Sequence, residues 1–326
     1  MLQPSFLRHQ SAKRLRQSAY NPKRLVLLHT AIGLGGVFIM TLANYLFSLQ
    51  IADTGGLSGM DLRAALATAQ SVLEFAVTVG LPLWNIGLFF AAYRWAKGET
   101  AEPADLLQGF RRFRSVVGFL LLRIVLFFIL AMGIVHIASM IFMMTPYATP
   151  LMNLMAPFLQ QSSAAEELLT DAFFAALFHE LMPLLILSAA FFALVAIPLF
   201  YRLRFSQFAL MSGLTCGKAL LKSIAVTRKN CLQILKLDLS YWWYYLLLGF
   251  SILISNGDRL LSALGIPLPI SATAAYFAFY SLGLICQGVL LWQCEARRLT
   301  AYCLAYHSLA GEDIPTFDDA SAHQPM

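Results

Sequence analysis

Three short motifs contain residue types used in proteolysis inside membranes, and each departs from its motif where the chemistry requires a particular residue. His179–Pro183 begins like the zinc motif HExxH, but Pro183 replaces the second histidine ligand. Glu166-Glu167 begins an EExxxR pattern in which Asp171 replaces the arginine, and Leu210–Gly213 lacks the first glycine of GxSG. There is also no phosphate-binding glycine loop. We therefore predict a non-enzymatic protein with no catalytic residue.

Cysteine usage also argues against a metal or redox site. The five cysteines form no CxxC pair, which is the spacing typical of zinc and dithiol sites. We therefore predict no metal site and no cofactor.

Polar residues within otherwise apolar segments are the remaining candidates for chemistry. Ionisable groups inside a membrane are costly and often functional, and four candidates stand out: Asn85, Arg123, His136 and Gln287. Arg123 lies about two helical turns into its segment, from where its side chain can reach the headgroups. A coupled transporter is expected to need more inward-facing polar groups, so a small-molecule or peptide transporter is the alternative function.

Long charge-free segments must position these residues. Six stretches without Asp, Glu, Lys or Arg are each at least 19 residues long, and about 20 apolar residues cross the roughly 30 Å hydrocarbon core as a helix. The predicted spans are about 25–50, 75–93, 116–144, 181–201, 239–256 and 272–294.

The composition supports this interpretation. Hydrophobic residues make up 59% and charged residues 12%, against about 45–50% and 25% in soluble domains. The spans also lack the short alternating pattern of a transmembrane β-barrel. The predicted fold is an all-α, polytopic transmembrane bundle of about six spans, with residues 1–310 as one domain and 311–326 as a polar tail.

Basic residues are distributed unevenly between the predicted loops. Of the 23 Lys and Arg residues, 20 fall in the N-terminus, the second and fourth connections and the C-terminus, whereas Arg63 and Arg259 fall on the other side. Lys and Arg are enriched on the cytoplasmic side of membrane proteins. We therefore predict a multi-pass protein of a bacterial cytoplasmic membrane, with both termini inside.

Two predicted cytoplasmic hairpins are basic and amphipathic. Thr100–Arg114 is expected to form one helix capped by Asp105, and Gly217–Lys236 repeats the arrangement with Leu220, Leu221 and Ile224 at helical spacing. Anionic lipid headgroups or a membrane protein partner are the expected binding partners, and nucleic acid is not. The candidate contact residues are Arg111, Arg112, Lys218 and Lys222.

Three further segments outside the spans are expected to contact membrane boundaries. Ser11–Lys23 is either a surface-bound basic stretch or simply a topology signal. On the outside, Ala164–Glu180 is predicted to be an acidic helix lying on the interface. The aromatic run Tyr241–Tyr245 is expected to form a structural belt at the headgroup boundary.

Several residues resemble a family of bacterial integral membrane proteins known as domain of unknown function 975. The resemblance covers most of residues 10–310, and its most specific part is Leu235–Trp243. Further matching residues are Arg94, Lys97-Gly98, Leu106–Phe110, Met211–Gly213, Ala219-Leu220, Ser223 and Lys229-Asn230. The resemblance implies a multi-span membrane protein of Gram-positive bacteria, without an established activity and without catalytic residues. The two basic amphipathic hairpins on the inner face and the acidic helix on the outer face predict a scaffold, accessory or envelope-homeostasis role.

Overall fold

The computed structural model describes residues 3–53, 59–159, 171–266 and 271–311, and these residues form helices and no strands. By internal contacts the chain divides into two compact units. Unit 1 comprises residues 1–117 and 205–326, and unit 2 comprises residues 118–204. The first boundary falls within the helix Phe113–Met143, and the second falls between the helices Asp171–Arg202 and Ser206–Met211.

Long apolar helices confirm the predicted multi-pass membrane fold. Five helical segments have the length and apolarity needed to cross a membrane: Pro22–Phe47, Ala64–Lys97, Phe113–Met143, Phe173–Met211 and Ala272–Ala310. The pair α10 (Cys231–Leu239) and α11 (Trp242–Ser255) is bent by 63° and supplies a sixth span if it is counted as one. The prediction of about six spans is therefore confirmed among the described residues.

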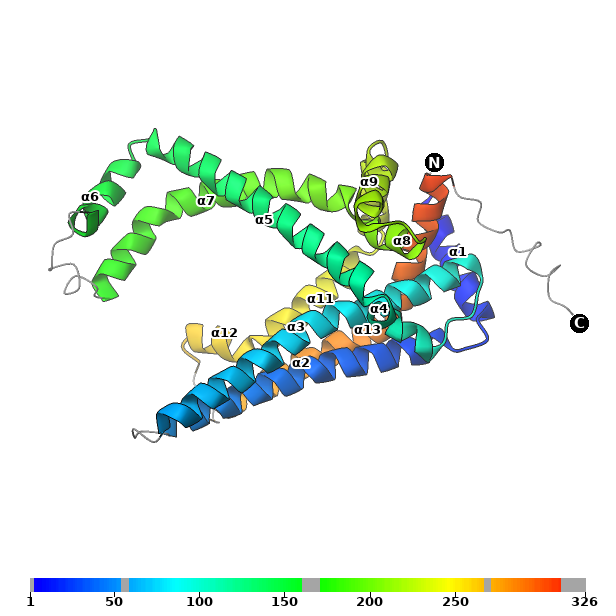
Figure 1. Cartoon of the computed structure of the whole chain (residues 1–326), viewed down its shortest axis with the longest axis horizontal. Coiled ribbons are helices and arrows are strands. Elements are labelled where there is room, and N and C mark those ends of the chain that lie inside the picture. Colours follow the sequence, from blue (N-terminus) through cyan, green and yellow to red (C-terminus); the bar gives the residue numbers. More distant parts are fainter. Residues whose placement is uncertain (1–2, 54–58, 160–170, 267–270, 312–326) are drawn as a thin grey trace, which may run out of the picture. The chain divides into compact units, whose positions relative to one another are not determined.

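Helix α13 (Ala272–Ala310) is the centre of unit 1. It packs against α2 (Pro22–Asp53), α3 (Gly59–Lys97) and α11, and these helices run alongside one another in Figure 1. A short helix, α12 (Gly257–Ala263), also contacts α13.

The main hydrophobic core of unit 1 lies where α1, α2, α3 and α13 meet. Its buried residues include Leu15, Leu25, Trp95, Leu106 and Leu299. The basic segments of unit 1 surround this core: they are α1, the two basic hairpins and residues 295–310 of α13. We call the core together with these segments the polar end of unit 1.

Two helices extend well beyond their predicted spans. The second predicted span began at Phe75, but α3 begins at Gly59; the sixth was predicted to end at Cys294, but α13 continues to Ala310. The extension of α13 is not solvated, because residues 299–307 are all buried. Neighbouring protein therefore takes the place of lipid around these turns.

Unit 2 consists of most of α5 (Phe113–Met143), α6 (Ala148–Leu159) and α7 (Asp171–Arg202), with α6 packed against α7. Many of its large apolar side chains are exposed, including Ile124 at 63%, Phe128 at 62% and Leu194 at 70%. Such exposure suits a hydrocarbon environment, in which apolar side chains need no protein cover.

The predicted interfacial helix over residues 164–180 is only partly described. Residues 160–170 lie outside the described part of the chain. Residues 171–180 do not form a separate surface helix, because they are the first turns of α7, which continues without a break to Arg202.

The first basic hairpin folds differently from the prediction. Instead of one helix over Thr100–Arg114, it forms a 3-10 helix, η1 (Pro103–Leu107), followed by α4 (Gln108–Arg111). Asp105 has the predicted capping role at a different position, because it is the third residue of η1 and caps the start of this helix as part of a capping box with Glu102. It is buried in η1, and its Oδ2 accepts hydrogen bonds from the Glu102 amide and from Arg94 Nη1, both at 2.8 Å.

The first hairpin lies directly on α3 because two glycines permit close backbone contact. A Cβ at Gly87 would overlap the Leu106 carbonyl oxygen, and a Cβ at Gly109 would overlap that of Leu83. The hairpin therefore packs backbone to backbone against α3 and is held in one place.

The second hairpin is amphipathic as predicted, although its buried face is rotated. It contains α8 (Ser206–Met211), α9 (Cys216–Thr227) and α10. In α9 the buried residues are Ala219, Leu220, Ser223, Val226 and Thr227, whereas Leu221 is 67% exposed. Packing against the rest of unit 1 selects this face.

The basic N-terminal segment is part of the folded protein. Helix α1 (Pro4–Gln17) packs on α13 and buries Leu7, Ser11, Arg14 and Leu15. Packing of α1 against α13 is compatible with both interpretations of Ser11–Lys23, the surface-bound stretch and the topology signal, and both stay predictions.

Two arginines of α1 bind backbone carbonyl groups at the ends of other helices. Arg14 Nη1 donates to the Ala96 carbonyl in the last turn of α3, and Arg8 Nη1 donates to the Ser240 carbonyl after α10 at 3.2 Å. Burial lowers the pKa of the Arg14 guanidinium, which nevertheless stays charged at neutral pH. Cations stabilise the carbonyl end of a helix, so α1 links α3 and α10.

We expect Gly109→Ala to lower the free energy of unfolding in detergent by about 1–3 kcal/mol, because the new methyl group must displace α3 or the hairpin. The matched control is Gly249→Ala in α11, where a Cβ would meet no atom within 4 Å and helix propensity alone predicts a small gain. Thermal unfolding of both variants measures the difference, and equal melting temperatures would contradict the close packing.

Candidate functional site

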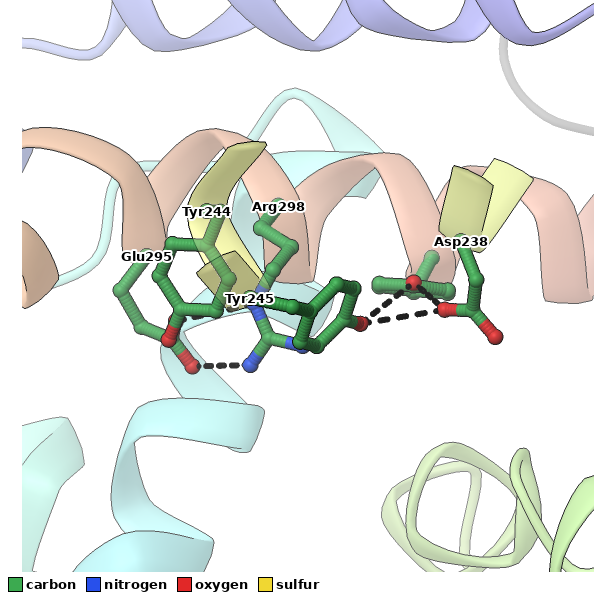
Figure 2. A network of polar contacts seen from close by, with 6 residues as sticks. Asp238, Tyr244, Tyr245, Glu295 and Arg298 are labelled. Carbon is green, nitrogen blue, oxygen red and sulfur yellow. Dashed lines mark hydrogen bonds and ion pairs between the residues drawn. The ribbon is translucent and has the colours of Figure 1, made fainter. Parts of the chain in front are cut away.

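A buried network of charged and aromatic residues connects three helices at the polar end of unit 1 (Figure 2). Glu295, Arg298 and Tyr302 occupy one face of α13, because residues three and four apart share a side of a helix. The bend between α10 and α11 brings Asp238 close to the same face, while Tyr244 and Tyr245 come from the first turn of α11.

An ion pair forms the first part of this network. Arg298 Nη2 donates to Glu295 Oε1 at 2.6 Å, and Arg298 Nε donates to Oε2 at 3.0 Å. The Tyr244 hydroxyl also donates to Glu295 Oε2, at 3.1 Å. The carboxylate is only 8% exposed, and these three donors replace the water that it loses on burial.

A carboxylate with two tyrosines forms the second part. The Tyr245 hydroxyl donates to Asp238 Oδ1 at 3.1 Å, and the Tyr302 hydroxyl donates to the same oxygen. The two hydroxyls are 3.2 Å apart. Asp238 and Tyr302 are separated by 64 residues in the sequence, so this contact fastens α10 to the end of α13.

Arg298 joins the two parts. Its guanidinium carbon lies 5.0 Å from the ring centre of Tyr244 and 5.7 Å from that of Tyr302. Stacking of a guanidinium on aromatic rings adds to its pairing with a carboxylate. The arrangement fixes α10, α11 and α13 relative to one another.

A second ion pair holds the first hairpin. Arg94, near the end of α3, binds Asp105 at 2.8 Å and Glu99 at 3.1 Å. The Asp105 side chain is 7% exposed and the Glu99 side chain 51% exposed, so the pair with Asp105 is the more protected from water. Arg94 and Arg14 thus both stabilise the end of α3, Arg94 through Asp105 and Arg14 through the Ala96 carbonyl.

The four predicted contact cations all belong to unit 1. Arg111, Arg112 and Lys218 are exposed and Lys222 is half-buried. The Cys216 thiol donates to the Ser115 carbonyl oxygen at 3.2 Å, which joins the start of α9 to the chain just after α4. The two basic hairpins therefore adjoin at this contact. We call their exposed basic part the hairpin surface and define it by these four residues.

The four predicted intramembrane polar residues are divided between the units. Asn85 on α3 is exposed and Gln287 on α13 is half-buried, both in unit 1. In unit 2, Arg123 is half-buried on α5 and His136 is exposed on the same helix. The apolar cavities along α13, one beside α2 and one beside α11, are lined by none of the four.

Several interacting residues were not predicted from the sequence. Glu74 immediately precedes the predicted span 75–93, but it lies inside α3 and accepts hydrogen bonds from Asn44 of α2 and from Gln70, both at 3.1 Å. Glu295 immediately follows the predicted span 272–294. Its i, i+3 spacing to Arg298 was the available signal for a helical ion pair.

The aromatic run at the start of α11 has two roles. Trp242 is 61% exposed and Trp243 is 39% exposed, as expected of rings at a membrane boundary. Tyr244 and Tyr245 instead bind Glu295 and Asp238. The predicted structural belt therefore describes only part of this run.

No group of three or more His, Cys, Asp or Glu residues that could hold a metal ion occurs in the described ranges. Comparison of the chain with protein-family models, with curated proteins and with solved structures gives no match. The resemblance to the domain of unknown function 975 family thus stays a prediction.

We expect Glu295→Gln to lower the free energy of unfolding by about 3–5 kcal/mol, because it leaves the Arg298 cation buried without its counter-charge. Glu99→Gln is the matched control, since a half-exposed pair contributes about 1 kcal/mol or less. Thermal and denaturant unfolding in detergent measure both variants.

A double variant separates the ion pair from a general packing effect. Replacing Glu295 and Arg298 together with Met removes both charges, so we expect it to be more stable than Glu295→Gln alone. A double variant that is less stable than the single one would contradict this account of the network.

Proposed function

We propose that this chain is a non-enzymatic protein of a bacterial cytoplasmic membrane, with both termini inside, that acts as a scaffold or accessory subunit for a membrane protein partner. The contact between Cys216 and Ser115 carries this proposal. It joins the start of α9 to the start of α5, which are 101 residues apart in the sequence. We infer that the two hairpins present their cations to a partner together.

The charges of the hairpin surface support binding to an acidic partner. Among the described residues, no carboxylate pairs with Arg111, Arg112, Lys218 or Lys222. Arg112 stacks over the Phe90 ring of α3 at 5.6 Å, which orients its guanidinium without neutralising it. Complementary charge favours encounter with an acidic surface and with anionic headgroups.

The rigidity of the surface favours a scaffold. Gly87 and Gly109 allow the first hairpin to lie against α3, and Arg94 binds Asp105 within it. A surface that is already ordered loses less conformational entropy when it binds. The hairpin surface is therefore suited to holding a partner at the headgroup level.

The proposed topology is tested with reporter fusions. We expect fluorescent protein fused at either terminus to fluoresce and alkaline phosphatase inserted after Ala263 to be active, because both tails are placed inside and α12 outside. As the reciprocal control, alkaline phosphatase fused to either terminus should be inactive, because both termini are placed inside. Active phosphatase at only one terminus would overturn the even number of spans.

The partner surface is tested by charge reversal. We expect Glu at positions 111, 112, 218 and 222 together to reduce the yield of cross-linked partner in native membranes by at least about 100-fold, because each cation contributes about 1 kcal/mol to binding an anionic surface. Neutralisation of the four residues to Gln should give an intermediate loss.

The matched control reverses Arg228 and Lys229, which are exposed at the turn between α9 and α10. Membrane insertion is compared by the terminal fusions, so that a change of topology is recognised. An unchanged cross-linking yield in a correctly inserted four-residue variant would contradict the proposal.

A further inference from the structure

A cationic cavity lies where α1, the turn into α2 and α13 meet. Its volume is about 370 Å³, and Arg16, Lys23 and Arg297 line it together with Trp292, Asn21 and Gln293. Leu15 and Ala296 contribute an apolar floor. All of these residues belong to unit 1, so the cavity is a feature of one compact unit.

The positive charge of this cavity is not balanced by the protein. None of its lining residues is acidic, and no carboxylate of the described chain pairs with Arg16, Lys23 or Arg297. Lys23 donates to Gln293 Oε1 at 3.2 Å and lies 5.6 Å from the Trp292 ring centre. Both contacts hold the ammonium group in place and leave its charge available to an anion.

An apolar groove lies between α2 and α13 and shares Trp292 with the cationic cavity. Its volume is about 460 Å³, and Leu27, Leu34, Phe38, Ile285 and Val289 are among its lining residues. Trp292 lines both the cavity and the groove. The two hollows therefore meet at this ring.

The groove is hollow because small residues line it. Gly35 faces open space, since a Cβ built there would meet no atom within 4 Å. Ala31 of α2 and Ser281 and Gly288 of α13 are further small residues that line it. A neighbouring glycine, Gly36, also faces open space but does not line the groove.

The dimensions and polarity match one leaflet of a bilayer. From Leu27 to Phe38 the groove extends along α2 for about 16 Å at 1.5 Å per residue, which is about half of the roughly 30 Å hydrocarbon core. Lys23 lies one helical turn before Leu27, at the end where headgroups would be. Tryptophan and lysine at this junction are typical of a membrane–water boundary.

We propose that this face of unit 1 binds an anionic phospholipid, with its phosphate in the cationic cavity and one acyl chain in the groove between α2 and α13. The site is separate from the hairpin surface, and it holds whether or not that surface binds a protein partner. An apolar chain gains contacts with the groove, and the phosphate gains three cations that have no counter-charge within the described protein.

Native mass spectrometry of the full chain in non-ionic detergent tests this site. We expect one phosphatidylglycerol to bind with higher affinity than phosphatidylcholine of the same acyl chains. Replacing Arg16, Lys23 and Arg297 with Gln should weaken phosphatidylglycerol binding roughly 100-fold, at about fivefold per cation. It should leave phosphatidylcholine binding nearly unchanged.

The groove is tested by Gly35→Leu, whose side chain would occupy the acyl position. We expect it to reduce the binding of both lipids by at least about tenfold, because the chain's apolar contacts are lost. Gly36→Leu is the matched control and should bind as the wild type does. Melting temperatures of all variants establish that they are folded.

Competition with inorganic phosphate distinguishes a lipid from a free anion. Displacement of phosphatidylglycerol only by other anionic lipids supports the lipid site. Equal binding of the two lipids by the wild type, or wild-type binding by Gly35→Leu, would overturn it. Phosphate that binds alone and displaces the lipid at equal concentration would identify a free-anion site instead.

Discussion

The cost of removing charged groups from water determines how the polar end of unit 1 is built. Glu295 is buried on α13 where a charge-free stretch ends, and such a carboxylate is tolerated only when donors surround it. Arg298 and Tyr244 provide those donors. Tyr244 comes from α11, so its hydrogen bond to Glu295 holds α11 beside α13, and the bond from Tyr302 to Asp238 holds α10 there as well. The end of α13 is buried by neighbouring protein as far as His307.

The same constraint explains the role of α1. The last carbonyl groups of a helix lack partners within that helix. Arg14 and Arg8 bind such carbonyls at the ends of α3 and α10, so a short basic helix joins elements far apart in the sequence. Leu7 and Leu15 are buried on the same helix. The polar end is therefore held by charge-assisted hydrogen bonds around a small apolar core, while the apolar lengths of α5 and α7 expose most of their side chains.

Basic residues that form one class in the sequence have different roles in the structure. Arg14, Arg94 and Arg298 bind acceptors within the protein. Another group defines the hairpin surface and has no carboxylate partners among the described residues, and a third lines the cavity at Trp292. All of them are consistent with a cytoplasmic topology signal, but only the second and third groups present their charge outward. The proposed partner surface and the proposed lipid site follow from that division.

The sequence by itself determined the all-α membrane fold, because crossing a bilayer requires long runs without charge and such runs can be read directly. It also indicated that both hairpins are amphipathic. Only the tertiary structure decided which face α9 buries, that η1 replaces a continuous helix, and that Asp238 meets Tyr302. These features depend on contacts between residues distant in the chain, such as the backbone approach at Gly109, and local periodicity carries no information about them.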